Sequence, residues 1–280
     1  MCIILIWKRL FGIFMNGTRL GYKILGILFK DQVYHPGRLV VDLSAIVARC
    51  GVLLALYWYV FQLRGGEVGG VSYPSIAWSI FFYFMFSLLR LREISQMIMM
   101  DVRSGNIETL LSKPVSYLSY RAWWQIGTGL YSFFAISIIG GALLFLLIGI
   151  PDAMRFPMFL PTLFFVFLGS ALLSLALYFI VGLLAFWIDD IQPVFWMVDK
   201  SVMILGGSYL PVALFPPMMY QLALWSPFGA SRFITHAAYD SWQSEWLGLL
   251  GIQMLWTVIL SVIVSVLFSL AKRRVSINGG

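Results

Sequence analysis

Six long apolar runs, joined by short polar connections, constrain this chain more than any other feature of its sequence. Each run approaches or exceeds the roughly 20 residues that an α-helix needs to cross a bilayer. Hydrophobic residues make up 61% of the 280 residues and charged residues only 11%, against about half and about a quarter in soluble proteins. We therefore predict an all-α integral membrane protein with six transmembrane helices, over residues 39–63, 73–89, 123–150, 159–188, 193–210 and 246–271.

The whole chain is predicted to form a single transmembrane domain, residues 1–280, because too little lies outside the spans for a separate soluble domain. Its parts are a cytoplasmic N-terminal segment (1–38), the six-span bundle (39–271) and a cytoplasmic tail (272–280). Over residues 11–29, apolar residues recur at helix-like intervals among basic ones, which predicts an interfacial helix on the cytoplasmic leaflet. The alternative is a frayed basic tail, since four glycines in this stretch weaken any helix.

The distribution of basic residues predicts how the helices are oriented. Of the nineteen Lys and Arg residues, fourteen fall in segments on one side and only three, Arg64, Arg155 and Arg232, on the other. Loops rich in Lys and Arg stay in the cytoplasm, so we predict a multi-pass protein of a bacterial inner membrane with both termini cytoplasmic. The net charge of +7 fits contact with anionic membrane lipids, and no nucleic-acid partner is predicted.

No set of residues in the sequence supports catalysis or metal binding. The sequence contains no Walker phosphate loop, HExxH or GxSxG motif. His35 and His236 are expected on opposite sides of the membrane, so they cannot share a metal. Asp189 and Asp190 are interpreted as a solvated helix end rather than a cation site. We therefore predict that the chain is not an enzyme and binds no cofactor directly.

Two acidic residues are predicted within the membrane, Asp42 and Asp199, both near its cytoplasmic edge. Asp42 and Arg49 are seven residues apart, so both can face the same side of the first span. Arg38, one turn before Asp42, can also pair with it. We interpret these charges as locally satisfied near the interface rather than as an ion pathway. The chain is thus predicted to carry no energy-coupling chemistry of its own.

The segment 91–121 is too polar to span the bilayer and too apolar to be a plain linker. It is predicted to be helical up to Val102, to break near residues 104–105, and to resume at Ile107 until Pro114 interrupts it. A projecting helix of mixed polarity suits the docking of a separate motor protein. The alternative is an ordinary interfacial amphipathic loop.

A second irregular stretch, residues 211–230, contains four prolines. The apolar helix that fits between them, residues 218–225, is too short to cross the membrane. We predict an external re-entrant segment between the fifth and sixth spans, whose backbone must be covered by protein or water.

Motifs in three stretches point to a known family. Residues 99–120 combine an acidic and a basic residue, a Ser-Gly break, the run Ile-Glu-x-Leu-Leu and a proline. This pattern resembles the segment after the second span in permeases of the ATP-binding-cassette (ABC) transporter type-2 family. Residues 29–43 resemble that family's entry to the first span, and residues 214–228 its external Pro-rich segment. The residues of the first match are Asp101, Arg103, Gly105, Ile107, Glu108, Leu110, Leu111 and Pro114.

The resemblance implies a permease subunit of an ATP-driven ABC exporter. Its partners would be a second permease, the same or a paralogous chain, and two copies of a cytoplasmic ABC ATPase, which would hold ATP and Mg. The coupling helix that docks on the ATPase would lie between spans two and three. The residues implied to dock are Glu93, Met97, Asp101, Arg103 and Glu108, and those implied to line the translocation path are Tyr57, Trp58, Phe195, Trp196 and Met203.

The substrate is expected to be amphiphilic, such as a lipid, glycolipid, drug or peptide, and to move outward by alternating access. This expectation depends on a candidate lining that is aromatic and lacks matched charges. The alternative function is a secondary active transporter that works without an ATPase, because the fifth span is interrupted by glycine and proline.

Overall fold

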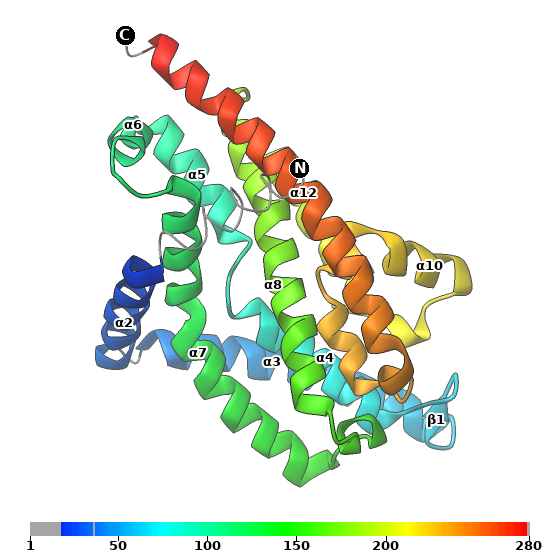
Figure 1. The fold of residues 1–280 in the computed structure, drawn as a ribbon. Helices are drawn as coiled ribbons and strands as arrows, with labels where there is room; N and C mark the ends of the chain where they lie inside the picture. Colours follow the sequence, from blue (N-terminus) through cyan, green and yellow to red (C-terminus); the bar gives the residue numbers. More distant parts are fainter. Residues whose placement is uncertain (1–17, 36, 279–280) are drawn as a thin grey trace.

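The computed structural model describes residues 18–35 and 37–278, and this part of the chain is helical apart from one small hairpin (Figure 1). The first residues of the predicted interfacial helix, 11–17, lie outside the described part. The elements are α2 (Thr18–Tyr34), α3 (Gly37–Leu63), β1 (Glu67–Val68), β2 (Val71–Ser72), α4 (Tyr73–Ser87), α5 (Glu93–Arg103), α6 (Asn106–Leu111), α7 (Tyr117–Ile148), η1 (Asp152–Arg155), α8 (Phe159–Leu183), η2 (Leu184–Phe186), α9 (Gln192–Leu205), η3 (Val212–Leu214), α10 (Pro217–Trp225), α11 (Pro227–Ala230), η4 (Phe233–Ala238) and α12 (Trp242–Asn278).

Four of the six predicted spans correspond to helices that are long and apolar enough to cross a membrane, in α3, α7, α8 and α12. The predicted second and fifth spans form α4 and α9, with 15 and 14 residues, fewer than the roughly 20 that a crossing requires. α4 ends at Ser87 because the chain turns there, and Arg90 adopts a left-handed conformation with φ 52°. α9 ends before Gly207, whose φ of 81° likewise suits a turn.

α4 lies at the centre of the core, where every residue from Ser75 to Phe86 is buried. It contacts α3, α7 and η4, while α8 packs along α12 (Figure 1). The apolar windows of α3, α7 and α12 are only 11%, 17% and 22% buried within the protein. Their exposed apolar side chains suit contact with lipid, because lipid tails are as apolar as the side chains themselves.

α2 packs along α7, and glycines allow the two helices to approach closely (Figure 1). A Cβ on Gly21 would lie 2.7 Å from the ring of Trp123, and a Cβ on Gly127 would lie 2.7 Å from Leu28. Across the same contact, the Gln32 amide donates to the Gly127 carbonyl at 2.8 Å. The alternative of a frayed tail is therefore wrong for the described part of this segment, because packing outweighs the low helix propensity of glycine.

The polar segment after α4 breaks where the sequence predicts, with α5 ending at Arg103 and α6 beginning at Asn106. Gly105, in the left-handed region at φ 74°, makes the break. α5 is fixed to α8, since a Cβ on Gly182 would lie 3.0 Å from the Cα of Ser95. The short helix in the Pro-rich stretch is also confirmed, as α10. The third span, in contrast, begins earlier than predicted, since α7 starts at Tyr117.

Substitution of Gly129 tests the packing of α7 against the end of α4. A Cβ on Gly129 would lie 2.2 Å from the backbone oxygen of Leu88, so we expect Gly129→Ala to lower the free energy of unfolding by about 1–3 kcal/mol. The matched control is Gly251→Ala in α12, where nothing lies within 4 Å of the new Cβ. That change should stabilise the helix by about 0.5–1 kcal/mol. Chemical unfolding in mixed micelles measures both, and equal effects would contradict the packing described here.

Candidate functional site

A cavity of about 300 Å³ lies among α3, the connection from α4 to α5, and α9. This volume is at the lower end of the range for small-molecule sites, roughly 300–1,000 Å³. Charged side chains within a membrane protein are costly and are usually functional. Their concentration here makes the cavity the candidate functional site. The charged residues of its wall are Asp42, Arg49, Arg90, Arg92, Glu93, Asp199 and Arg232.

One face of α3 forms a wall of this cavity. Asp42, Ala45, Ile46 and Arg49 line it, and their spacing of three, four and seven residues places them along one side of a helix. The prediction that Asp42 and Arg49 face the same side is confirmed. Asp42 is buried, whereas the Arg49 side chain is exposed in the cavity.

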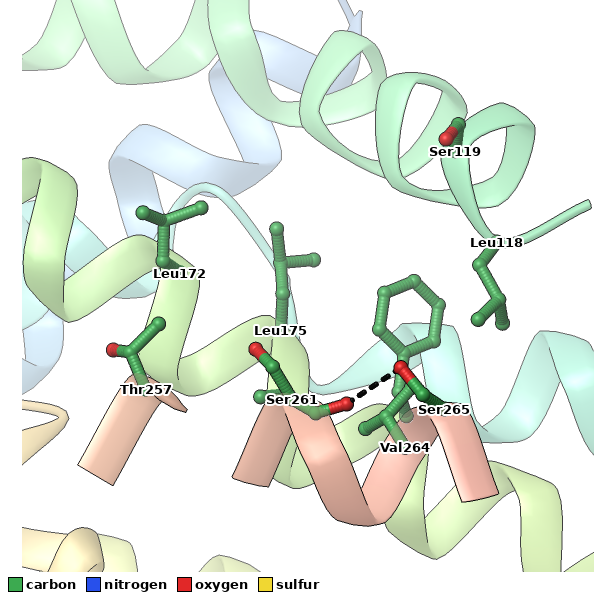
Figure 2. Close-up of a pocket in the computed structure, with 10 residues that line it drawn as sticks. Leu118, Ser119, Leu172, Leu175, Thr257, Ser261, Val264 and Ser265 are labelled. Carbon is green, nitrogen blue, oxygen red and sulfur yellow. Dashed lines mark hydrogen bonds between the residues drawn. The ribbon is translucent and has the colours of Figure 1, made fainter. Parts of the chain in front are cut away.

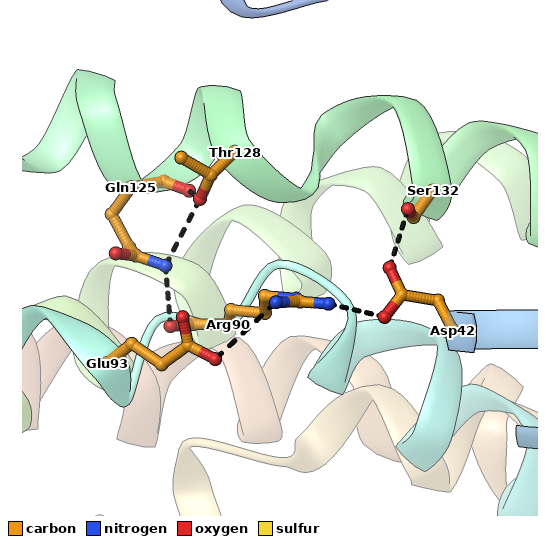
Figure 3. A network of polar contacts seen from close by, with 6 residues as sticks. All are labelled: Asp42, Arg90, Glu93, Gln125, Thr128 and Ser132. Carbon is orange, nitrogen blue, oxygen red and sulfur yellow. Dashed lines mark hydrogen bonds and ion pairs between the residues drawn. The ribbon is translucent and has the colours of Figure 1, made fainter. Parts of the chain in front are cut away.

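Asp42 joins three separate parts of the chain (Figure 3). Its carboxylate forms an ion pair with Arg90, in the connection between α4 and α5. It also accepts a hydrogen bond from Ser132 on α7 at 2.8 Å. The predicted partner, Arg38, has a side chain outside the described part of the structure. Asp42 thus fastens α3 to the core, rather than only balancing a neighbouring charge at the interface.

Arg90 is held by its backbone as well as by its guanidinium. A left-handed conformation costs a non-glycine residue about 1–3 kcal/mol, and Arg90 has a φ of 52°. Its carbonyl accepts a hydrogen bond from the Gln125 side chain at 2.9 Å, and Glu93 lies 3.9 Å from its guanidinium (Figure 3). These contacts and the ion pair to Asp42 offset the strain and aim the side chain into the cavity.

A second buried carboxylate, Asp199 on α9, has an equivalent set of partners. Arg92 approaches it at 3.2 Å, and the Tyr178 hydroxyl on α8 donates to it at 3.0 Å. The wall of this cavity therefore carries matched charges, unlike the aromatic lining predicted for the translocation path. The sequence places Arg90 and Arg92 in a cytoplasmic loop, whereas the chain turns back and directs both side chains into the cavity.

Arg232, which the orientation count places in an external segment, is buried in the core. It is 6% exposed and donates to the Ser174 hydroxyl at 2.9 Å. Its guanidinium lies 4.7 Å from the Phe86 ring centroid and 5.6 Å from that of Tyr83. Gly206 leaves room for the aliphatic stem, since a Cβ there would lie 2.5 Å from the Arg232 Cγ. The fold thus makes a specific place for this arginine.

Two of the predicted docking residues make internal contacts. Asp101 is buried and forms a two-pronged ion pair with Arg121. It also accepts a hydrogen bond from the Tyr117 hydroxyl at 2.6 Å, so it ties α5 to the start of α7. Arg103 donates to the carbonyl of Asp189 at 2.9 Å. Both residues fix the position of α5.

The other three predicted docking residues are Glu93, Met97 and Glu108. Glu108 is exposed on α6, while Glu93 and Met97 are partly buried on α5. Met100 is 59% exposed at the end of α5. The end of α5 together with α6, residues 100–114, therefore forms an exposed tip that is anchored behind by Asp101 (Figure 1). We refer to it as the α5–α6 tip.

Of the five predicted translocation-path residues, only Met203 lies in the wall of the cavity. Tyr57 and Phe195 are buried in the core, and the hydroxyl of Tyr57 donates a hydrogen bond to a backbone carbonyl at 2.7 Å. Trp58 and Trp196 are 53% and 50% exposed, as expected for side chains that face lipid.

Another pocket, between α7, α8 and α12, is apolar and much smaller (Figure 2). Its volume is about 70 Å³, below the range of small-molecule sites. The hydroxyl of Ser265 points back to the carbonyl of Ser261 at 2.8 Å, and therefore offers little to a ligand. The pocket is best described as a packing groove.

Sequence reasoning missed Arg90, Arg92 and Arg232 as parts of one site. Their signal in the sequence is weak, because Arg90 and Arg92 stand at the end of an apolar run, where a basic residue usually marks a loop. Arg232 stands among small and apolar residues, in GASRFITHAA. A lone arginine flanked by Gly, Ala and Ser is the feature that could have indicated burial.

In the part of the chain that the structure describes, four apolar helices of spanning length define a multi-pass helical membrane protein. Within the described ranges, no group of three or more His, Cys, Asp or Glu side chains could hold a metal ion. Residues 50–279 match the ABC-2 family transporter protein, and the chain belongs to this family. Its members are membrane permeases that lack catalytic activity themselves and generally pair with ATPase subunits. A search of curated proteins finds no match to this chain.

A double-mutant cycle tests the ion pair between Asp42 and Arg90. Either single change, Asp42→Asn or Arg90→Gln, leaves a partly buried charge without its partner and should lower the free energy of unfolding by about 3–5 kcal/mol. The double variant should lose less than the sum, with a coupling of about 0.5–3 kcal/mol. The control is the exposed pair of Asp152 and Arg155, where Asp152→Asn should change stability by about 0.5 kcal/mol or less. Additive losses in the cycle would contradict the ion pair between Asp42 and Arg90.

Proposed function

We propose that this chain is the permease subunit of an ATP-driven exporter that moves an amphiphilic substrate outward across a bacterial inner membrane. Family membership is the observation that carries the proposal. In this arrangement α4 and α9 complete six membrane-embedded segments, and both are shorter than a full crossing because protein covers their ends. Both termini and the α5–α6 tip lie in the cytoplasm, while the β1–β2 hairpin, η1 and α10 lie outside.

Two copies of a cytoplasmic ATPase would dock on the α5–α6 tips of two permeases, the same or a paralogous chain. ATP and Mg would be held by the ATPase. Support comes from the exposure of Met100 and Glu108, which offer an apolar and an acidic contact on the tip. Glu93 and Met97 lie on α5 behind the tip, and Arg103, within it, donates to the carbonyl of Asp189.

The anchoring of α5 suggests how movement of the ATPases would reach the cavity. α5 is packed against α8 through Gly182 and tied to α7 by the ion pair of Asp101 with Arg121. Its N-terminal end continues into the connection that carries Arg90 and Arg92. A rigid-body shift of the tip would therefore displace both arginines relative to Asp42 and Asp199, and could open the cavity alternately to the two sides.

Recovery of an ATPase with the purified permease tests the docking role of the tip. We expect a tagged protein, isolated from its native host in mild detergent, to bring down a chain with a Walker motif. Glu108→Lys combined with Met100→Asp should reduce the recovered ATPase about tenfold, equivalent to about 1.4 kcal/mol of binding free energy. The matched control is Glu67→Lys, an exposed acid in the β1–β2 hairpin at the far end of the molecule (Figure 1). If no ATPase is recovered with the unmodified protein, a secondary active transporter becomes the better proposal.

Cysteine labelling tests the proposed orientation. In a background with Cys2→Ser and Cys50→Ala, a membrane-impermeant maleimide should label Glu67→Cys and Asp152→Cys in intact spheroplasts. Ser112→Cys, on the α5–α6 tip, should react only after the membrane is permeabilised. All three positions are exposed in the structure, so burial does not explain a difference between them. Labelling of Ser112→Cys in intact spheroplasts would refute the orientation.

A further inference from the structure

The charges of the cavity wall do not balance. Four arginines and three carboxylates line it, and the two buried carboxylates form ion pairs with Arg90 and Arg92. The third, Glu93, also lies nearest to Arg90 at 3.9 Å. Two arginines therefore remain in the wall without an acidic partner among the described residues, Arg49 and Arg232.

Arg232 is the stronger indication, because a buried guanidinium without a carboxylate is unfavourable in any protein interior. Within the described part of the chain its Nε has no hydrogen-bond acceptor, and its Nη1 has only neutral partners, the Ser174 hydroxyl and a backbone carbonyl. The rings of Phe86 and Tyr83 favour a cation, but they cannot accept its in-plane N–H groups. An oxygen with negative charge would satisfy this guanidinium.

Arg49 lines the same cavity, from α3. It lies within the candidate span Leu39–Leu63, and no hydrogen bond or ion pair to it exists in the described part of the chain. An unpaired arginine within a membrane span is a functional residue by default, with a partner still to be named. Two guanidiniums without an acidic partner in the wall of one cavity suit an oxyanion, because a guanidinium matches the geometry of carboxylate and phosphate oxygens.

The rest of the wall adds an apolar requirement. Ala45, Ile46, Phe86 and Met203 stand beside the arginines, so a ligand that fills the cavity meets apolar side chains as well as charge. A volume of about 300 Å³ accommodates a headgroup and the start of a chain, and not a whole lipid.

We propose that the cavity binds an oxyanion, a phosphate or carboxylate group, between Arg49 and Arg232, and that this group is the polar end of the transported amphiphile. That this group belongs to a transported molecule rests on the proposed function, while the oxyanion site itself rests on the cavity alone. Asp42 and Asp199 neutralise Arg90 and Arg92. Arg49 and Arg232 carry the positive charge that selects the ligand.

Binding of three probes to the purified full-length protein, with its ATPase where one is recovered, tests the site. Lysophosphatidic acid carries a phosphate monoester, lysophosphatidylcholine of equal chain length has a zwitterionic head, and inorganic phosphate has no chain. Native mass spectrometry and competition titration in a neutral detergent give the affinities. We expect lysophosphatidic acid to bind at least about tenfold more tightly than lysophosphatidylcholine, the discrimination that one charge-assisted hydrogen bond provides.

Arg49→Gln is the decisive variant, because Arg49 has no partner in the described structure and its loss should not disturb folding. It should weaken lysophosphatidic acid about tenfold and leave lysophosphatidylcholine unchanged, whereas Arg64→Gln, in the exposed turn before β1, should change neither. Arg232→Lys keeps the buried charge but loses the planar fork, and should also weaken the anionic probe. The site would be overturned if the folded Arg49→Gln protein bound lysophosphatidic acid normally. It would also be overturned if this change dissociated a dimer of the permease without loss of probe binding.

The probes also identify the source of the oxyanion, and they distinguish failure of the oxyanion site from failure of the proposed exporter. Inorganic phosphate that binds as tightly as lysophosphatidic acid, and depends on Arg49, would support the oxyanion site but overturn the amphiphile as its source. If an ATPase co-purifies but lysophosphatidic acid does not bind, the oxyanion site is overturned and the proposed exporter is not. Arg49-dependent binding without any ATPase would leave the oxyanion site standing and remove the proposed exporter.

Discussion

The ion pair of Asp42 with Arg90 is the contact on which the rest of this structure depends. A carboxylate on an apolar helix must find a cation or lose its charge, because desolvation in a low-dielectric interior costs several kcal/mol. Asp42 finds Arg90 only because the chain turns sharply after α4, with Arg90 in a left-handed conformation. The same turn starts α5 in a new direction and places Arg92 beside Asp199. One electrostatic requirement thus links α3, α9 and the helix proposed to meet the ATPase.

Close packing completes what the ion pairs begin. The absence of a side chain allows close contact of Gly129 with the backbone of Leu88, of Gly182 with α5, and of Gly206 with the aliphatic part of Arg232. Each glycine lies where a polar or charged element must come close to an apolar helix. Helices in lipid gain little from burying apolar surface, so van der Waals contact and interhelical hydrogen bonds supply much of the attraction between them. The glycines therefore determine where charged groups can be enclosed, and so where a cavity can form.

Sequence patterns predicted the architecture better than the site. Apolar length alone located the four long helices, and Gly105 marked the break between α5 and α6, because these features are local. The shortness of α4 and α9 was not visible, since the apolar run after Tyr73 continues through Leu89 beyond the end of the helix. Charge pairing was missed for another reason. Asp42 and Arg90 are 48 residues apart, and no periodicity within one helix reveals a partner at that separation.

The cavity combines two demands that conflict in a membrane. Its charged groups must be kept away from lipid, and yet in the proposed exporter a substrate must be able to reach them. Pairing Asp42 and Asp199 with arginines from one short connection satisfies the first demand, because it neutralises all four charges. Leaving Arg49 and Arg232 unpaired satisfies the second, because a guanidinium gains most from an anion when no carboxylate of the protein competes for it. If α5 shifts, the paired arginines move with it while Arg49 stays on α3 and Arg232 stays beside η4. The distances among the four arginines then change, and with them the affinity for an anion, which is the differential binding that alternating access requires.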